Sequence, residues 1–291
     1  MMPRDTLAVI GGSGAHTLLE AHAHALTRLE PVATPFGLSA PIYRVRMEDA
    51  AFLFLPRHGE TGYEIAAPWV NYRANIYALK ENGVSYIMSW SGPAALDNSL
   101  NIAEYVLPND LIDETRGRES SFYKGTGLGF IRQHPVFCLE MHDAAVVTFS
   151  RLGIQYRPEG IYICTQGPRL ETAAEIHRYR QWRAHLVGMT LAPEVFLARE
   201  LEMCYHPVCY VANYAEGVKQ RETRPGELFD EMLEGAEREA VSEAVGRMFE
   251  IAAALSRTLP DERQCACALA MERYRREGRI GEDWHTWIGK P

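Results

Sequence analysis

A set of polar and charged side chains of the kinds that bind phosphate and heterocycles follows predicted strands in this sequence. It comprises three hydroxyls, an Arg-His pair, a carboxylate and an amide: Ser13, Ser91, Thr190, Arg57, His58, Glu171 and Asn213. An arginine offers phosphate oxygens a planar fork of donors, and hydroxyls and backbone amides complete such a cradle. A carboxylate and an amide can form hydrogen bonds with the edge of a heterocycle. The set therefore predicts a phosphate site beside a heterocycle site.

The elements that must position these side chains are short apolar strands ending in polar loops. The predicted strands are Leu7–Ile10, Ile42–Arg46, Phe52–Leu55, Val84–Ser89, His185–Gly188 and Val208–Val211. A short apolar run bounded by turn residues is typical of a buried strand. In α/β proteins ligands bind at the carboxyl ends of such strands. We therefore expect the loops that follow these strands to meet around one ligand.

The stretch Tyr162–Glu175 joins a further predicted strand to a helix. Gly167-Pro168 ends the strand, and Thr172 with Glu175 has the spacing of a capping box. Glu171 thus lies in the turn at a strand's carboxyl end. Acidic residues near a helix N-terminus are also favoured by the helix dipole. An ordinary structural role for Glu171 therefore stays open beside a role in binding a ligand.

Two short patterns suggest other chemistry. Gly11-Gly12-Ser13-Gly14 lacks the spacing of a dinucleotide fingerprint and the lysine of a P-loop, so we expect neither a nicotinamide nor a nucleoside triphosphate site. Arg57-His58-Gly59-Glu60 resembles the motif of histidine phosphatases and phosphoglycerate mutases, whose histidine accepts a phosphoryl group. In that family the motif follows the first strand, whereas here an earlier strand precedes it. A solvated surface Arg-His pair is the third interpretation.

Composition limits the class of protein. The chain has 291 residues, 47% hydrophobic and 23% charged, with a formal net charge of -8, which is typical of a globular protein and disfavours wrapping nucleic acid or lying on an anionic membrane. We see no signal-peptide pattern, no run long enough to span a bilayer, no repeats and no linker. The six cysteines have apolar neighbours, which favours free thiols in the cytoplasm. Cys265 and Cys267 form a C-x-C pair, which can close a disulfide or bind a metal, but without partners at zinc spacing we expect no metal site.

Longer segments give further expectations. Asn71–Asn82 has a helical pattern and ends at Gly83. Asp113–Pro135 is polar and lacks periodicity, which indicates a functional or mobile loop. Residues 227–255 carry an apolar stripe (Val241, Val245, Met248, Ala252 and Leu255) at spacings of four and three, so we expect one helix. Two interpretations of Leu228, Phe229 and Met232 stay open, the lining of an apolar pocket or the core of this helix, and we favour the core. A second helix is expected over residues 265–277.

Two segments, GPRLETAAE and VGMTLAPEVFLARE, together closely resemble the trimeric purine nucleoside phosphorylase and methylthioadenosine phosphorylase family. NYRANIYALKENGV at Asn71–Val84 is similar to it as well. The resemblance implies an α/β fold in which residues 1–291 form a single nucleoside phosphorylase-like domain, with a central twisted, mostly parallel mixed sheet flanked by helices and a helical extension from about residue 261. It implies phosphate-dependent cleavage of a purine nucleoside to base and ribose 1-phosphate, with phosphate as co-substrate and no cofactor. The implied assembly is a homotrimer or a dimer of trimers, with the loop around Phe122–His134 crossing between subunits.

The same resemblance assigns site residues. Phosphate-binding positions match Ser13, Arg57, His58, Ser91, Gly92 and Thr190; a ribose-lining position matches Met189; and base-recognition positions match Glu171 and Asn213. Asn213, Glu171 and His58 are the expected catalytic residues. Phe130 and His134 are candidates to reach a neighbouring subunit's site. Pro93-Ala94 departs from the small or glycine-containing run that is usual in the phosphate turn.

Two departures separate the branches of the family. The motifs PRHG and VGMT-x-x-PEV are similar to those of methylthioadenosine phosphorylases. Those enzymes, however, carry a small hydroxyl residue at the position of Glu171 and an Asp-x-Asp at the positions of Asn213 and Ala215. Glu171 with Asn213 resembles the 6-oxopurine enzymes, because an ionised carboxylate can accept the N1–H of a 6-oxopurine. We therefore expect inosine, guanosine or 5′-methylthioinosine to be preferred. The alternatives are a methylthioadenosine phosphorylase, phosphoryl transfer through His58, and nucleoside binding without catalysis.

Overall fold

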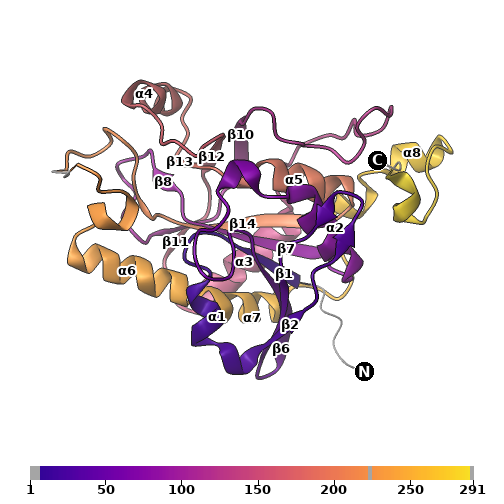
Figure 1. The fold of residues 1–291 in the computed structure, drawn as a ribbon, viewed down its shortest axis with the longest axis horizontal. Helices are drawn as coiled ribbons and strands as arrows, with labels where there is room; N and C mark the ends of the chain where they lie inside the picture. The colour runs from indigo at the N-terminus through magenta and orange to yellow at the C-terminus, as the bar shows by residue number, and fades with distance from the viewer. Residues whose placement is uncertain (1–6, 222–224, 289–291) are drawn as a thin grey trace.

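The computed structural model describes residues 7–221 and 225–288, and within them a large sheet forms the centre of the molecule (Figure 1). Its strands, in spatial order, are β11 (Tyr156–Arg157), β9 (Tyr105–Val106), β14 (Cys204–Tyr210), β7 (Tyr86–Ser91), β1 (Leu7–Gly11), β6 (Ala50–Pro56), β5 (Ile42–Met47) and β2 (Leu26–Leu29). β6, β1, β7 and β14 run parallel, whereas β2 and β5 add antiparallel pairs at one side. The predicted mostly parallel mixed sheet is confirmed.

Alternate residues of the central strands face opposite cores. In β1, Ala8 and Ile10 belong to one core, while Leu7 and Val9 belong to the other. The helices α2 (Tyr72–Glu81) and α5 (Leu191–Glu200) cover the first core, and α3 (Leu139–Arg151), α6 (Gly235–Gly246) and α7 (Met248–Thr258) cover the second. A strand buried on both faces needs apolar residues at every position, which explains the continuous apolar run of β1.

A second, smaller sheet carries the predicted ligand turn. Its strands, in order, are β10 (Asp110–Glu114), β12 (Ile161–Thr165), β13 (Leu186–Gly188), β8 (Ala94–Ala95) and β15 (Asn213–Tyr214). Helix α4 (Ala173–Gln181) packs on it through Ile176 and Tyr179, which join a cluster with Ile163 and Val187. The predicted capping box is present at its start, because Thr172 and Glu175 each accept the other's backbone N–H. The smaller elements are α1 (Thr17–Ala21), the hairpin β3 (Ala33–Thr34) and β4 (Gly37–Leu38), α8 (Glu272–Arg276) and the 3-10 helices η1 (Ala23–Ala25), η2 (Ala67–Trp69), η3 (Phe229–Met232), η4 (Ala266–Leu269) and η5 (Trp284–Trp287).

The single helix expected over residues 227–255 is wrong. The structure divides this segment into η3, α6 and α7, and Gly246, a residue of low helix propensity, ends α6. The break lets α6 pack beside β14 while α7 lies against β6. The buried stripe is still found, since Val245, Met248, Ala252 and Leu255 are all in the core. No helix in the described ranges is long and apolar enough to cross a membrane.

Two further expectations about the C-terminal third also fail. Leu228 and Phe229, expected in the core, are 48% and 53% exposed, because α6 begins only at Gly235 and does not carry them inward. The helix expected over residues 265–277 is divided into η4 and α8. α8 begins after Met271, whose backbone N–H donates to the Glu202 carboxylate. This segment, yellow in Figure 1, lies at the opposite side of the view from α4 and α6.

Candidate active site

The register of the parallel strands brings the carboxyl ends of β1, β6 and β7 to one level. Gly11 pairs with Pro56 of β6 and with Trp90 of β7. Neighbouring strands lie about 4.8 Å apart, so the residues after these ends converge. Ser13 and His58, which follow β1 and β6, accordingly line the same small pocket. The phosphate positions after these strands are therefore neighbours in space.

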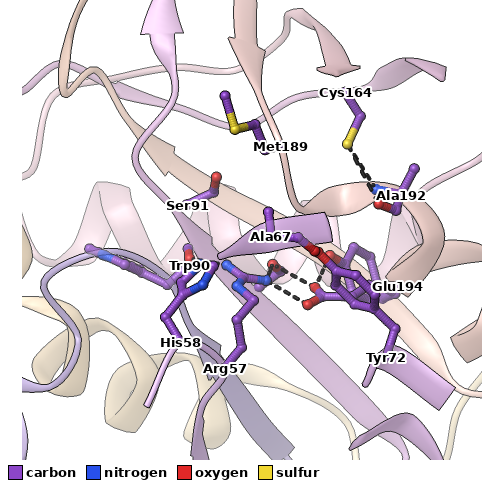
Figure 2. Close-up of polar contacts among 12 residues, drawn as sticks. Arg57, His58, Ala67, Tyr72, Trp90, Ser91, Cys164, Met189, Ala192 and Glu194 are labelled. Carbon is purple, nitrogen blue, oxygen red and sulfur yellow. Dashed lines mark hydrogen bonds and ion pairs between the residues drawn. The ribbon is translucent and has the colours of Figure 1, made fainter. Parts of the chain in front are cut away.

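Arg57, which lies between the pocket residues Pro56 and His58 in the sequence, forms a buried ion pair with Glu194 (Figure 2). One of its terminal nitrogens donates to Glu194 at 2.6 Å, and the other donates to the backbone carbonyl of Trp90 at 2.9 Å. Burial works against the charge of Arg57, but Glu194 and its neighbours hold the pKa of Arg57 above its ordinary value. The sequence predicts a free guanidinium fork for phosphate, whereas the structure shows a fork bound to protein groups.

Arg57 nevertheless reaches the edge of the predicted anion site. A Cβ atom on Gly12 would lie 3.0 Å from a terminal nitrogen of Arg57 and 2.7 Å from the Trp90 carbonyl oxygen, so only glycine fits there. The Nε atom of Arg57 is buried and has no hydrogen-bond partner among the described residues. Arg57 therefore places a fixed positive charge against the turn after β1.

His58 is held as a neutral imidazole. Its Nδ1 lies 2.8 Å from the backbone carbonyl oxygen of Ile65, and a carbonyl only accepts, so Nδ1 carries the proton. Burial, and then the charge of Arg57, lower the pKa of His58 to about 3. The ring stacks on Tyr63 with centroids 4.1 Å apart. Nε2 is therefore left as an acceptor, suited to a phosphate or sugar hydroxyl.

The other predicted phosphate residues come from β7 and α5. Ser91 is the last residue of β7, is buried, and lies 3.4 Å from the hydroxyl of Tyr162 (Oγ to Oη). Gly92 follows it, and a Cβ atom there would lie 2.6 Å from the hydroxyl of Tyr210. Thr190 occupies the N-cap position of α5 yet forms no side-chain cap within the described residues. Its hydroxyl is thus available to a ligand.

The predicted base residues lie at the second sheet. Glu171 accepts a hydrogen bond from the Thr165 hydroxyl at 2.5 Å, which fixes the carboxylate against the end of β12. Asn213, in β15, pairs with Ala94 of β8, while Ala94 also pairs with Val187 of β13. The Asn213 amide donates to the Tyr214 carbonyl at 3.1 Å and has a second N–H to offer. Met189, the predicted ribose-lining residue, directly follows β13 and precedes Thr190 in the chain.

The phosphate positions and base positions are joined through β7 and its continuation. Ser91 and Gly92 lead directly into β8, which lies between β13 and β15. Comparison with known families agrees with this arrangement, because the model described as "Phosphorylase superfamily" matches residues 6–255. The chain belongs to the phosphorylase superfamily. The match extends from β1 into α7, so it covers all of the strand ends described above.

Individual phosphorylases resemble the chain over nearly its whole length. It is 36% identical to the 6-oxopurine nucleoside phosphorylase of Pyrococcus furiosus, with 93% of this chain and 98% of that protein covered. It is 35% identical to a probable S-methyl-5′-thioinosine phosphorylase of Thermodesulfovibrio yellowstonii, with 91% and 96% covered. A crystal structure of a methylthioadenosine phosphorylase from an antarctic soil metagenomic library superposes with a TM-score of 0.77 at 28% identity, covering 91% of this chain and 90% of that one.

Glu194 is a functional candidate that the sequence analysis missed. It is 2% exposed and, besides Arg57, accepts hydrogen bonds from the hydroxyls of Ser89 at 3.2 Å and Tyr205 at 2.8 Å. These partners come from β7, β14 and the loop after β6. A buried glutamate costs free energy unless it is paired, so the presence of Glu194 in an apolar helix was the available signal for a buried cation.

Arg118 is a second residue that was missed, within the loop expected to be functional or mobile. Its guanidinium donates to the backbone carbonyls of Met189 and Ala192, each at 2.7 Å, and of Gln166 at 2.6 Å. It thereby ties the ends of β12 and β13 to the start of α5. No local pattern marks this role, because all three carbonyls lie about 50 to 75 residues away in the sequence.

Proposed function

We propose that the chain cleaves the N-glycosidic bond of a purine nucleoside with inorganic phosphate, giving the free base and a ribose 1-phosphate. The observation that supports this is the small pocket shared by the loops after β1 and β6, with the end of β7 in register beside β1, in a member of the phosphorylase superfamily. Phosphoryl transfer through His58 loses support, because the family match concerns phosphorylases. The neutral His58 serves instead as an acceptor in the phosphate site.

The chemistry needs positioning more than covalent catalysis. As in glycoside hydrolysis, the sugar passes through an oxocarbenium-like state, which an anion below the anomeric carbon stabilises. Phosphate held by Ser13, Ser91 and Thr190 above the charge of Arg57 would be that anion and the nucleophile. The departing purine gains negative charge, and the free N–H of Asn213 can stabilise it at N7 or O6.

We propose that 6-oxopurines are preferred to 6-aminopurines. Thr165 occupies one oxygen of Glu171, which leaves the other to accept the N1–H of hypoxanthine or guanine. Adenine presents a bare N1 there, and a lone pair facing a carboxylate is unfavourable. A pocket that binds one hydrogen-bonding pattern can reject the other by roughly 10⁴-fold. Both a 6-oxopurine nucleoside phosphorylase and a methylthioadenosine phosphorylase resemble this chain. Overall similarity therefore does not select the base, and the proposed preference rests on Glu171.

The experiment compares kcat/KM for inosine, adenosine and their 5′-methylthio analogues, with and without phosphate, in the wild type and Glu171→Ser. We expect phosphate-dependent base release, a strong preference for the 6-oxo substrates, and loss of that preference in Glu171→Ser. Glu216→Gln, which changes an exposed carboxylate near Asn213, should keep the wild-type ratio. Release without phosphate would overturn the proposed reaction, and an unaltered ratio in Glu171→Ser would overturn only the base assignment.

The 5′ end of the sugar has an apolar candidate neighbour. η3, which begins with the exposed Phe229, packs beside β15 and its Asn213. An exposed aromatic ring at the start of this helix, near the base position, favours a 5′-methylthio group over a hydroxyl, since burying the ring against carbon and sulfur is favourable. We therefore propose 5′-methylthioinosine ahead of inosine. The alternative 5′-methylthioadenosine is tested in the same set of assays.

We propose a homotrimer, or a dimer of trimers, in which the segment after Phe122 contacts a neighbouring subunit. Phe122 itself is buried against Phe36, with ring centroids 5.2 Å apart. Phe130, by contrast, is 80% exposed although its backbone N–H is held by the Tyr274 hydroxyl at 2.8 Å. A large apolar ring held outward is suited to an interface. Light scattering should give a trimer or hexamer and a smaller species for Phe130→Ala, and a fully active wild-type monomer would contradict the proposal.

A further inference from the structure

Four cysteine side chains from three distant segments meet in one place. The sulfur atoms of Cys138, Cys204, Cys265 and Cys267 all lie within 4.8 Å of one another, and those of Cys204 and Cys265 are 3.2 Å apart. All four are free thiols. A tetrahedral zinc site with bonds of about 2.3 Å places its sulfur atoms about 3.8 Å apart. The four sulfur atoms therefore already have nearly the separation that one ion requires.

The surroundings are those of a closed site. Cys138, Cys204 and Cys267 are at most 6% exposed, and Cys265 closes the outer side. Cys138 is the N-cap residue of α3, so it lies at the positive end of that helix dipole. Four thiolates with one divalent cation carry a net double negative charge, which this helix end partly offsets. Without a cation, four thiolates at such distances would repel one another strongly.

From this geometry we propose that the chain binds a structural zinc ion through Cys138, Cys204, Cys265 and Cys267. Four thiolate ligands at tetrahedral separations are typical of zinc, and four protein ligands leave no open position for a substrate. Cys204 begins β14, whose other end lies at the phosphate site roughly 20 Å away at 3.3 Å per residue. The ion is thus remote from the reacting atoms.

The position of the site explains what the ion would hold. Cys265 and Cys267 belong to the segment after α7, whereas Cys138 and Cys204 belong to the body of the molecule. The same C-terminal segment is fastened by the ion pair of Arg275 with Glu202, and its Tyr274 hydroxyl binds the loop at Phe130. Zinc would therefore tie the C-terminal segment to α3 and β14, and through Tyr274 support that loop.

The test measures metal content. The full chain is purified under reducing conditions with zinc supplied, and the metal is identified and counted by plasma mass spectrometry. We expect one zinc ion per chain in the wild type, loss of the ion in Cys265→Ser, and retention in Cys209→Ser, which changes a buried cysteine outside the cluster. Removal of the ion by a strong chelator should lower Tm and speed proteolysis after α7.

A second measurement covers the case in which Cys265→Ser does not fold. Wild-type protein reconstituted with Co²⁺ should show the intense sulfur-to-metal absorption of tetrathiolate coordination. Absence of stoichiometric metal in reduced protein, or iron in place of zinc, would overturn the proposal. So would mass spectrometry of the isolated, unreduced chain that finds these cysteines joined in disulfides.

Discussion

At the scale of single residues, a substitution of Arg57 would change both phosphate binding and stability, because Arg57 forms an ion pair with Glu194. Both side chains are almost completely buried. Removing one partner of a buried pair leaves an uncompensated charge, which typically costs 3–5 kcal/mol. Ser13, by contrast, is exposed at the mouth of the pocket. Loss of its hydroxyl should therefore affect the ligand and leave stability unchanged.

We predict that Ser13→Ala and Arg57→Ala both raise KM for phosphate, by roughly ten- to a hundredfold for a lost charge-assisted bond. Only Arg57→Ala should also lower the free energy of unfolding, by about 3–5 kcal/mol. Phosphate titrations and urea unfolding on both variants measure the two quantities. Unchanged phosphate dependence in both would place the anion site elsewhere.

At the scale of elements, the close approach of the ends of β7 and β14 sets the shape of the phosphate turn. A Cβ atom on Gly92 would lie 2.6 Å from the Tyr210 hydroxyl, and that hydroxyl donates to the Ser13 carbonyl at 3.2 Å. Gly92→Ala must therefore displace Tyr210 and, through it, the turn after β1. The departure at Pro93-Ala94 affects the turn less, because Ala94 pairs regularly with β13 and β15.

We predict that Gly92→Ala raises KM for phosphate by about tenfold, the effect of one lost hydrogen bond to a charged group. Gly246→Ala is the matched control, because a Cβ atom there would meet nothing within 4 Å. It should leave KM unchanged and slightly stabilise α6. Equal kinetic effects of the two substitutions would show that the contact with Tyr210 is unimportant.

At the scale of the whole molecule, Glu200 connects α5 to the long loop and makes stability depend on pH. Its carboxylate accepts hydrogen bonds from the Ser121 hydroxyl and the Phe122 N–H, each at 2.7 Å. Burial nevertheless raises the pKa of Glu200 to about 7 from 4.5. The folded state thus binds this proton more tightly than the unfolded state, so the contribution of Glu200 to stability is fully present below pH 4.5 and is lost as pH rises through about 7.

We predict that the free energy of unfolding of the wild type, relative to Glu200→Gln, falls by up to about 3 kcal/mol between pH 4.5 and 8, at about 1.4 kcal/mol per unit of pKa shift. Urea unfolding at a series of pH values measures this difference. Glu119→Gln removes an exposed acid of the same loop and should follow the wild type. Parallel curves for the wild type and Glu200→Gln would show that Glu200 does not titrate in this range.

The local patterns of the sequence were sufficient wherever one segment decides its own structure. Apolar runs ending in polar loops located β1, β6 and β7, and Thr172 with Glu175 located the start of α4. These succeed because strand burial and helix capping depend on residues a few positions apart. The same reasoning failed over residues 227–255, because an amphipathic stripe persists across the break at Gly246.

The sequence alone determined the family, the α/β fold and the candidate strand-end residues, because motifs and hydrophobic periodicity are properties of contiguous segments. Only the tertiary structure decided that Arg57 faces Glu194, that Arg118 joins three strand and helix ends, and that Leu228 and Phe229 are exposed. It also brought Cys138 and Cys204 to the C-x-C pair. The contacts join residues far apart in the chain, and the exposure of Leu228 and Phe229 depends on where α6 begins. The spacing of residues along one segment determines neither of these.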